Sequence, residues 1–142
     1  MHILMIDDEV EYLKGHASYL QLEGFEVTRK SNLDEALHLL GTQTFDLITL
    51  DLLMPAQGVA TQNKTRRPPD LRRTGLLVHQ EIRLKLELKD TPIIFMSVLR
   101  DEKIRNEIIQ FERQFGREAV FLAKPVRPSE LIVEINRALG IR

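Results

Sequence analysis

The sequence predicts an α/β fold, in which a single doubly wound parallel sheet of five strands carries helices on both faces. Short apolar runs alternate along the chain with segments whose apolar residues recur at helical spacing, so that a strand is followed by a helix five times. Alternating units of this size form parallel sheets through right-handed crossovers. The second run, residues 25–28, alternates apolar and polar side chains as an edge strand does. The edge character of the second and fifth runs favours the strand order 2-1-3-4-5.

Each strand is expected at a short apolar run, and each helix at an apolar stripe bounded by capping or breaking residues. The strands are expected at residues 3–6, 25–28, 47–50, 93–96 and 120–123. The helices are expected at residues 9–23, 33–40, 76–89, 104–115 and 128–139. Ser31 and Asp34 resemble a capping box for the second helix. The glycines expected to end helices are Gly24, Gly41 and Gly140.

Composition limits the classes of function that the chain can have. A chain of 142 residues corresponds to about one domain, large enough to bury a core. The balance of 20 basic and 21 acidic residues argues against binding nucleic acid or a membrane through overall charge. The absence of Cys excludes disulfides, thiolate nucleophiles and Cys-based metal sites. The histidines are isolated in sequence and are expected at the surface or half-buried: His2, His16, His38 and His79. No apolar run approaches the ~20 residues of a membrane-spanning helix, and no signal sequence precedes the first strand, so we expect a cytoplasmic protein.

Polar side chains follow four of the five predicted strands. Asp7 and Asp8 follow the first strand and Asp51 follows the third. Ser97 follows the fourth strand and Lys124 follows the fifth. Because the carboxyl ends of parallel strands lie at one edge of a sheet, we expect these side chains to converge there.

Such a group of side chains suits phosphoryl transfer to a carboxylate. Clustered carboxylates raise one another's pKa unless a cation is present, and Mg²⁺ accepts carboxylate ligands while leaving room for phosphate oxygens. Lys124 could pair with Asp51 before phosphorylation and with a phosphoryl oxygen afterwards. Ser97 could donate a hydrogen bond to a second phosphoryl oxygen. A carboxylate can itself be the nucleophile, and Asp51 is the candidate.

Four short segments resemble the receiver domains of two-component response regulators, which have a flavodoxin-like fold. The segments are Ile6-Asp7-Asp8-Glu9, Asp51-Leu52-Leu53-Met54-Pro55, Phe95-Met96-Ser97 and Phe121-Leu122-Ala123-Lys124-Pro125. Each segment alone is weak evidence for the family. Together they occur in the family's order at predicted strand ends, which makes the resemblance specific. The resemblance covers nearly the whole chain except residues 57–74.

The resemblance implies a phosphoacceptor role for Asp51. The donor would be a phosphohistidine on a sensor histidine kinase or on a histidine phosphotransfer protein. Mg²⁺ would be held by Asp7, Asp8, Asp51 and the backbone carbonyl of Leu53. The protein would not be an enzyme acting on other substrates, because it would catalyse only its own phosphorylation and dephosphorylation.

The resemblance also implies a conformational switch. Ser97 would move toward the phosphoryl group, Phe121 would turn inward, and Lys124 would contact the phosphoryl group and precede a cis Pro125. A downstream target protein would read the change on the face formed by the fourth helix, the fifth strand and the fifth helix. Because the last predicted helix ends near the last residue, we expect the protein to act through protein contacts, as a stand-alone regulator, a relay intermediate or part of a longer chain.

The chain departs from the family pattern after the third strand. Residues 56–74 contain Gly58, Pro68 and Pro69 without helical or strand periodicity and predict a loop, with a basic insertion at about residues 57–74. The basic residues that could contact a partner or ligand are Lys64, Arg66, Arg67, Arg72 and Arg73. The insertion could be a solvated loop, a docking element for an acidic partner surface, or a contact for a ligand or nucleic acid, in decreasing order of preference.

Two other functions compete with the phosphoacceptor hypothesis. An aspartate-nucleophile phosphatase would want a second Asp two residues after Asp51, where this chain has Leu53. A receiver-like scaffold for protein interaction would no longer be regulated by phosphorylation. Phosphorylation by small acyl phosphates with Mg²⁺ would separate the scaffold from the switch.

Overall fold

The computed structural model describes residues 1–53, 71–98 and 101–141, and its sheet has the predicted topology. All five strands pair in parallel in the order β2-β1-β3-β4-β5, which confirms the fold class and the strand order. The strands are β1 His2–Ile6, β2 Glu26–Lys30, β3 Leu47–Leu50, β4 Ile93–Ser97 and β5 Val120–Ala123. Every residue of β3 and β4 is buried, whereas β2 and β5 are only partly covered. The two edge strands are thus the least buried, as parallel sheets require.

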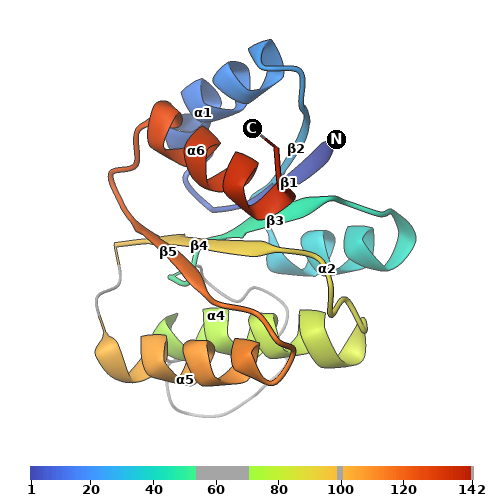
Figure 1. Cartoon of the computed structure of the whole chain (residues 1–142), viewed down its shortest axis with the longest axis vertical. Coiled ribbons are helices and arrows are strands. Elements are labelled where there is room, and N and C mark those ends of the chain that lie inside the picture. Colours follow the sequence, from blue (N-terminus) through green and yellow to red (C-terminus); the bar gives the residue numbers. More distant parts are fainter. Residues whose placement is uncertain (54–70, 99–100, 142) are drawn as a thin grey trace.

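Helices cover both faces of the sheet (Figure 1). The helices are α1 Val10–Leu22, α2 Leu33–Thr42, α4 Leu71–Gln80, α5 Glu102–Arg113 and α6 Pro128–Leu139. A short π-helix, η1 Glu81–Lys85, continues α4. One core cluster joins the sheet to α1 and α6, and the other joins it to α2, α4, η1 and α5. Among the residues that the structure describes, no helix is both long and apolar enough to span a membrane.

The caps of α2 differ from the prediction. Asn32, not Ser31, is the N-cap, because its side chain accepts hydrogen bonds from the amides of Asp34 and Glu35. Asn caps helices as well as Ser does, so residue type alone could not decide between two adjacent candidates. Gly41 lies inside the helix, which ends at Thr42. Gly24 and Gly140 do follow their helices, with φ of 96° and 69°.

The helix predicted at residues 76–89 is displaced at both ends. It begins at Leu71, so residues 71–74 are helical and not part of a loop. Apolar periodicity marks the buried face of a helix and not its start, and Leu and Arg both favour helix. The helical segment ends at Lys85, because Glu87 takes the left-handed conformation with φ of 56°. Arg83 holds the turn that follows, donating to the carbonyls of Leu88 and Thr91 at 2.6 Å each.

Candidate functional site at the carboxyl edge of the sheet

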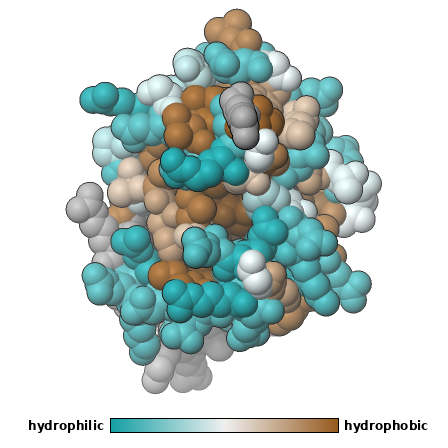
Figure 2. All heavy atoms as spheres, in the orientation of Figure 1, coloured by the Kyte–Doolittle hydropathy of each residue, from teal (hydrophilic) through white to brown (hydrophobic). Residues whose placement is uncertain are grey.

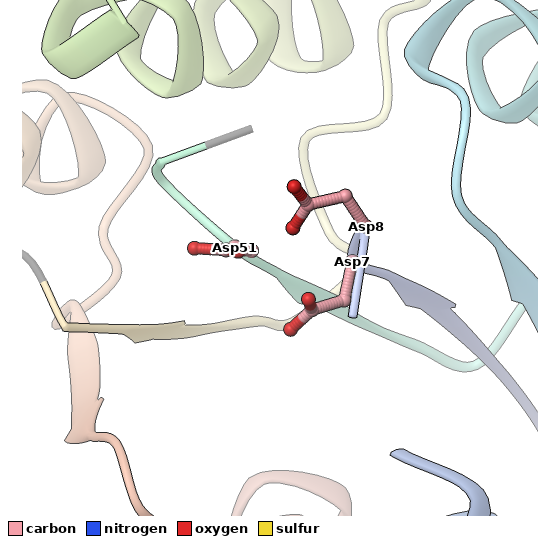
Figure 3. Close-up of side chains that lie close together, drawn as sticks. All are labelled: Asp7, Asp8 and Asp51. Carbon is pink, nitrogen blue, oxygen red and sulfur yellow. The ribbon is translucent and has the colours of Figure 1, made fainter. Parts of the chain in front are cut away.

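Three carboxylates meet where β1 and β3 end. Asp7 and Asp8 follow β1, and Asp51 follows the neighbouring β3. One oxygen of each lies within 4.8 Å of the others (Figure 3). Asp7 and Asp51 are 3% and 4% exposed, whereas Asp8 is exposed to solvent. The structure therefore brings together the three carboxylates that the sequence analysis singled out.

Backbone amides fix the orientation of the two buried carboxylates. The amide of Glu9 donates to Oδ1 of Asp7 at 2.9 Å, and the amide of Leu53 donates to Oδ1 of Asp51 at 3.0 Å. Both contacts join a residue to the second one after it, which is the turn that Asp favours where a strand gives way to a loop. In each case the other oxygen, Oδ2, is left for a further partner.

Lys124 supplies that partner from the end of β5. Its Nζ lies 2.6 Å from Oδ2 of Asp7 and 3.4 Å from Oδ2 of Asp51. The half-exposed carboxylate of Glu9 lies further away, at 3.9 Å. The Lys124 side chain is 4% exposed, and the peptide bond to Pro125 is cis, as the resemblance implied. We call Asp7, Asp8, Asp51 and Lys124 the acidic site.

The acidic site carries more negative charge than its single ammonium group compensates. Burial raises the pKa of Asp7 from 3.8 to about 6, and the charge of Asp51 adds to this rise. Hydrogen bonds from Lys124 and from the Glu9 amide act in the opposite direction without cancelling it. Burial alone would lower the pKa of Lys124, but its hydrogen bond with Asp7 and the surrounding carboxylates outweigh burial and raise it. A divalent cation would relieve this excess of negative charge, and an all-oxygen ligand set suits Mg²⁺.

Ser97 and Phe121 lie beside the acidic site on β4 and β5. Ser97 is buried at 5% exposure, and its carbonyl accepts a hydrogen bond from the amide of Lys124 at 3.1 Å. Phe121 is half-buried, and its ring stacks on Phe95 with the centroids 5.3 Å apart. The guanidinium of Arg105 lies 4.8 Å from the centre of the Phe121 ring. Ser97, Phe121 and Arg105 all line one cavity of about 390 Å³.

The predicted basic residues of the insertion lie outside the part of the chain whose side chains the structure describes. Lys64, Arg66 and Arg67 lie outside the described residues. Arg72 and Arg73 lie in the first turn of α4, but the positions of their side chains are not described. The roles proposed for this basic segment therefore stay predictions.

Sequence reasoning missed two buried histidines and their partners. His79 is fully buried, and its Nε2 lies 2.5 Å from Oε1 of Glu112 on α5. Arg83 is also fully buried and contacts the same carboxylate through Nε at 2.7 Å and Nη2 at 2.9 Å. We call His79, Arg83 and Glu112 the ion triad. His16, on α1, is 5% exposed. The expectation of surface or half-buried positions is therefore wrong for His16 and His79, because each finds a polar partner on a distant segment.

One signal could have pointed to His16. It lies four residues after Tyr12 on the helix that begins just after Asp8, so both side chains occupy one face of α1. In the ion triad the same spacing relates His79 to Arg83, but nothing in the sequence points to Glu112, which lies 33 residues after His79.

Comparison with known proteins identifies the family to which the chain is similar. A profile of the family described as the response regulator receiver domain matches residues 3–136. The probable transcriptional regulator ycf27 of Cyanidium caldarium is 31% identical over 138 residues, which cover 97% of this chain and 46% of that protein. The transcriptional regulatory protein ResD of Bacillus subtilis is 29% identical over 137 residues, which cover 96% of this chain and 47% of that protein. The chain thus spans about half the length of the curated relatives it matches.

Solved structures show the same fold. A CheY-like response regulator receiver domain protein from Methanospirillum hungatei JF-1 matches with a TM-score of 0.73 and 22% identity, covering 98% of this chain and 93% of that one. The chemotaxis response regulator CheY4 of Vibrio cholerae matches with a TM-score of 0.71 and 25% identity, covering 97% and 98% of the two chains.

Proposed function

The chain belongs to the response regulator receiver domains, and we propose that it is a phosphoacceptor switch in which Asp51 takes a phosphoryl group from a phosphohistidine. The donor would be a sensor histidine kinase or a histidine phosphotransfer protein in the cytoplasm. The observation that carries the proposal is the buried Asp51 carboxylate, which lies within 4.8 Å of two other carboxylates and 3.4 Å from the ammonium of Lys124. Family membership supports a signalling role and not a metabolic one.

The chain's own residues can prepare Asp51 for this reaction. The amide of Leu53 holds Oδ1 of Asp51, so the nucleophile is oriented before the donor arrives. An oxygen of Asp51 would attack the phosphorus, forming an O–P bond while the N–P bond to the partner's imidazole breaks and its electron pair stays on the ring nitrogen. Lys124 already lies between Asp7 and Asp51, so a short movement of its ammonium group would bring it to a phosphoryl oxygen.

The excess of negative charge in the acidic site supports Mg²⁺ as the cofactor. The residues that would hold it are Asp7, Asp8, Asp51 and the backbone carbonyl of Leu53. When bound, Mg²⁺ would neutralise charge on the carboxylates and on the phosphoryl oxygens. The raised pKa of Asp7 supports this assignment, because burial disfavours the ionised carboxylate and the positive charge of the described residues does not offset that penalty.

The surroundings of Ser97 and Phe121 support a switch at the face formed by α5, β5 and α6. A phosphoryl group adds about −1.5 to −2 charges, which would attract the Ser97 hydroxyl and Lys124. The cavity of about 390 Å³ beside Ser97 gives the Phe121 ring room to move. β5 is an edge strand with half-buried apolar residues, and Figure 2 shows an apolar region in the middle of this face, between hydrophilic side chains. A downstream target protein would bind there.

Phosphorylation by acetyl phosphate tests the proposal directly. Intact protein would be incubated with acetyl phosphate and Mg²⁺, and its mass would be measured. We expect wild type and Asp46→Asn to gain one phosphoryl group, and Asp51→Asn to gain none. Asp46 is a matched control because it is an exposed Asp just before β3, where it accepts a hydrogen bond from the amide of His2.

Two results would contradict the proposal. Wild-type protein that takes up no phosphoryl group from acetyl phosphate or from a histidine phosphotransfer protein would favour the scaffold alternative. Equal modification of wild type and Asp51→Asn would place the acceptor elsewhere.

A further inference from the structure

Two side chains of α1 hold the backbone just after Lys124. The hydroxyl of Tyr12 accepts a hydrogen bond from the amide of Val126 at 2.6 Å and lies 3.4 Å from its carbonyl oxygen. Nε2 of His16 contacts that same carbonyl. Both polar backbone groups of Val126 are thus engaged by side chains more than a hundred residues away in the sequence. The segment that follows Lys124 is therefore fastened to α1.

The backbone of Lys124 is consequently fixed on two sides. On one side, its amide donates to the carbonyl of Ser97 at 3.1 Å. On the other side, two residues further along, lies Val126 with its contacts to α1. The Tyr12 ring also approaches the charged end of the side chain, because Nζ of Lys124 lies 5.2 Å from the ring centre. Tyr12 therefore touches both the anchor of the Lys124 segment and its ammonium group.

The packing of α1 does not require these polar contacts. Leu13, Ala17 and Leu20 of α1 are buried in the core cluster that contains β1 and α6. Tyr12 lies at the edge of this cluster and is only partly buried. Its hydroxyl adds no apolar area to the core, but it provides an acceptor for the Val126 amide, which burial would otherwise penalise.

We propose that Tyr12 is a positioning residue for phosphoryl transfer and that, with His16, it keeps the Lys124 ammonium between Asp7 and Asp51. This inference rests on the proposed phosphoacceptor function. Tyr12 would act through Lys124 and would not touch the phosphoryl group or Mg²⁺. The proposed metal ligands follow β1 and β3, whereas the segment that Tyr12 holds follows β5. Loss of the hydroxyl should therefore impair the action of Lys124 without weakening metal binding, because the Lys124 ammonium competes with a cation for the carboxylates of Asp7 and Asp51.

The decisive variant is Tyr12→Phe, which keeps the ring near Lys124 and removes only the hydroxyl. Tyr19→Phe is a matched control, since Tyr19 lies two turns further along α1 at the edge of the same core cluster. For each protein, the rate of phosphorylation by acetyl phosphate would be measured at saturating Mg²⁺, with the Kd for Mg²⁺ measured separately. We expect Tyr12→Phe to slow phosphorylation by about 3- to 10-fold, because small displacements of a catalytic group lower rates steeply. Its Kd for Mg²⁺ should be no higher than that of wild type, and Tyr19→Phe should match wild type in both rate and Kd.

A double-mutant cycle shows whether the effect passes through Lys124. In a Lys124→Ala background, we expect Tyr12→Phe to produce no further decrease in rate. An equal decrease in both backgrounds would overturn the inference, as would a Tyr12→Phe rate equal to that of Tyr19→Phe.

NMR can follow the Nζ resonance of Lys124 in the unphosphorylated protein. This measurement does not depend on phosphorylation, so it distinguishes failure of this inference from failure of the proposed function. We expect Tyr12→Phe to shift the resonance and Tyr19→Phe to leave it in place. If wild type cannot be phosphorylated but the resonance still shifts, the phosphoacceptor proposal fails while the positioning contact stands. If wild type is phosphorylated and the resonance does not shift, the positioning role fails alone.

Discussion

The acidic site and the ion triad each contain buried ionisable side chains, but their charge balance is opposite. The acidic site sets three carboxylates against one ammonium group, whereas the ion triad surrounds one carboxylate with a guanidinium and an imidazole. The consequences appear in the pKa values. Burial and a neighbouring carboxylate raise the pKa of Asp7 to about 6. Burial would also raise the pKa of Glu112, but the hydrogen bonds and charges of His79 and Arg83 outweigh burial and lower it to about 2.

This difference distinguishes a group of charges that stabilises the fold from one that can serve a reaction. The Glu112 carboxylate already has its hydrogen-bond partners within the protein, so it needs none from outside. The described residues of the acidic site carry more negative than positive charge, and a bound cation would offset this excess. The imbalance therefore favours binding of a cation. Removing a carboxylate should therefore have opposite effects on stability in the two places.

The largest expected effect comes from Glu112→Gln. This change keeps the size of the side chain but leaves the guanidinium of Arg83, which is fully buried, without its ionic partner. Breaking a buried ion pair from one side typically costs about 3–5 kcal/mol. We therefore expect the free energy of unfolding, measured by urea denaturation at pH 7.5, to fall by about that amount.

Glu134→Gln is the matched control for this change. Glu134 pairs with Arg137 at 2.9 Å on the surface of α6, where the arginine side chain is 71% exposed. We expect a loss of about 0–1 kcal/mol there. Similar losses in the two variants would show that the ion triad is not a special source of stability.

A smaller loss of stability is expected when acid, and not a mutation, removes the charge of Glu112. The folded state lowers the pKa of Glu112 from 4.5 to about 2, so the unfolded chain binds the proton more tightly. The stabilisation from its charge is complete above pH 4.5 and is lost as the pH falls toward 2. Its size is about 3 kcal/mol.

The pH dependence should therefore differ between wild type and Glu112→Gln. The difference between their free energies of unfolding, followed by urea denaturation from pH 6 to pH 2.5, should shrink by about 2–3 kcal/mol. A difference that stays constant across this range would show that folding does not change the pKa of Glu112.

The sequence could predict the acidic site because its members share one topological property. Asp7, Asp51 and Lys124 each stand directly after an apolar run, and the edge of a parallel sheet brings such positions together whatever their separation along the chain. The strand order was predicted separately, from the edge character of the second and fifth apolar runs. The placement of the site is thus a consequence of the fold, although the sequence does not show that the protein uses it.

The sequence could not predict the ion triad, because no repeating pattern relates its members. His79 and Arg83 lie four residues apart on a helix whose end was misplaced, and their partner lies on another helix. A buried charge and an exposed charge look alike in a sequence, since apolar periodicity reports only which face is covered. The spacing of Tyr12 and His16 places both on one face of α1, but nothing in the sequence points to Val126 as their partner.

The smallest effect, and the one of opposite sign, is expected for Asp7→Asn. At neutral pH the ionised Asp7 opposes folding, because its pKa rises from 3.8 in the unfolded chain to about 6 in the folded one. The stability that the protonated form contributes below pH 3.8 is lost as the pH rises through 6. An uncharged Asn removes this penalty but also gives up the ion pair with Lys124. We therefore expect the free energy of unfolding without divalent cations at pH 7.5 to rise by about 1–3 kcal/mol.

Urea denaturation in the presence of a chelator measures this change, with Asp46→Asn as the control. Asp46 is exposed, and Asn keeps an oxygen that can accept the hydrogen bond from the His2 amide, so its replacement should change stability by at most about 0.5 kcal/mol. Added Mg²⁺ should stabilise wild type and Asp46→Asn but have little effect on Asp7→Asn, because that variant lacks a proposed metal ligand. If Asp7→Asn proved less stable than wild type under chelation, Lys124 would be sufficient compensation for the carboxylates, and the contrast between the acidic site and the ion triad would disappear.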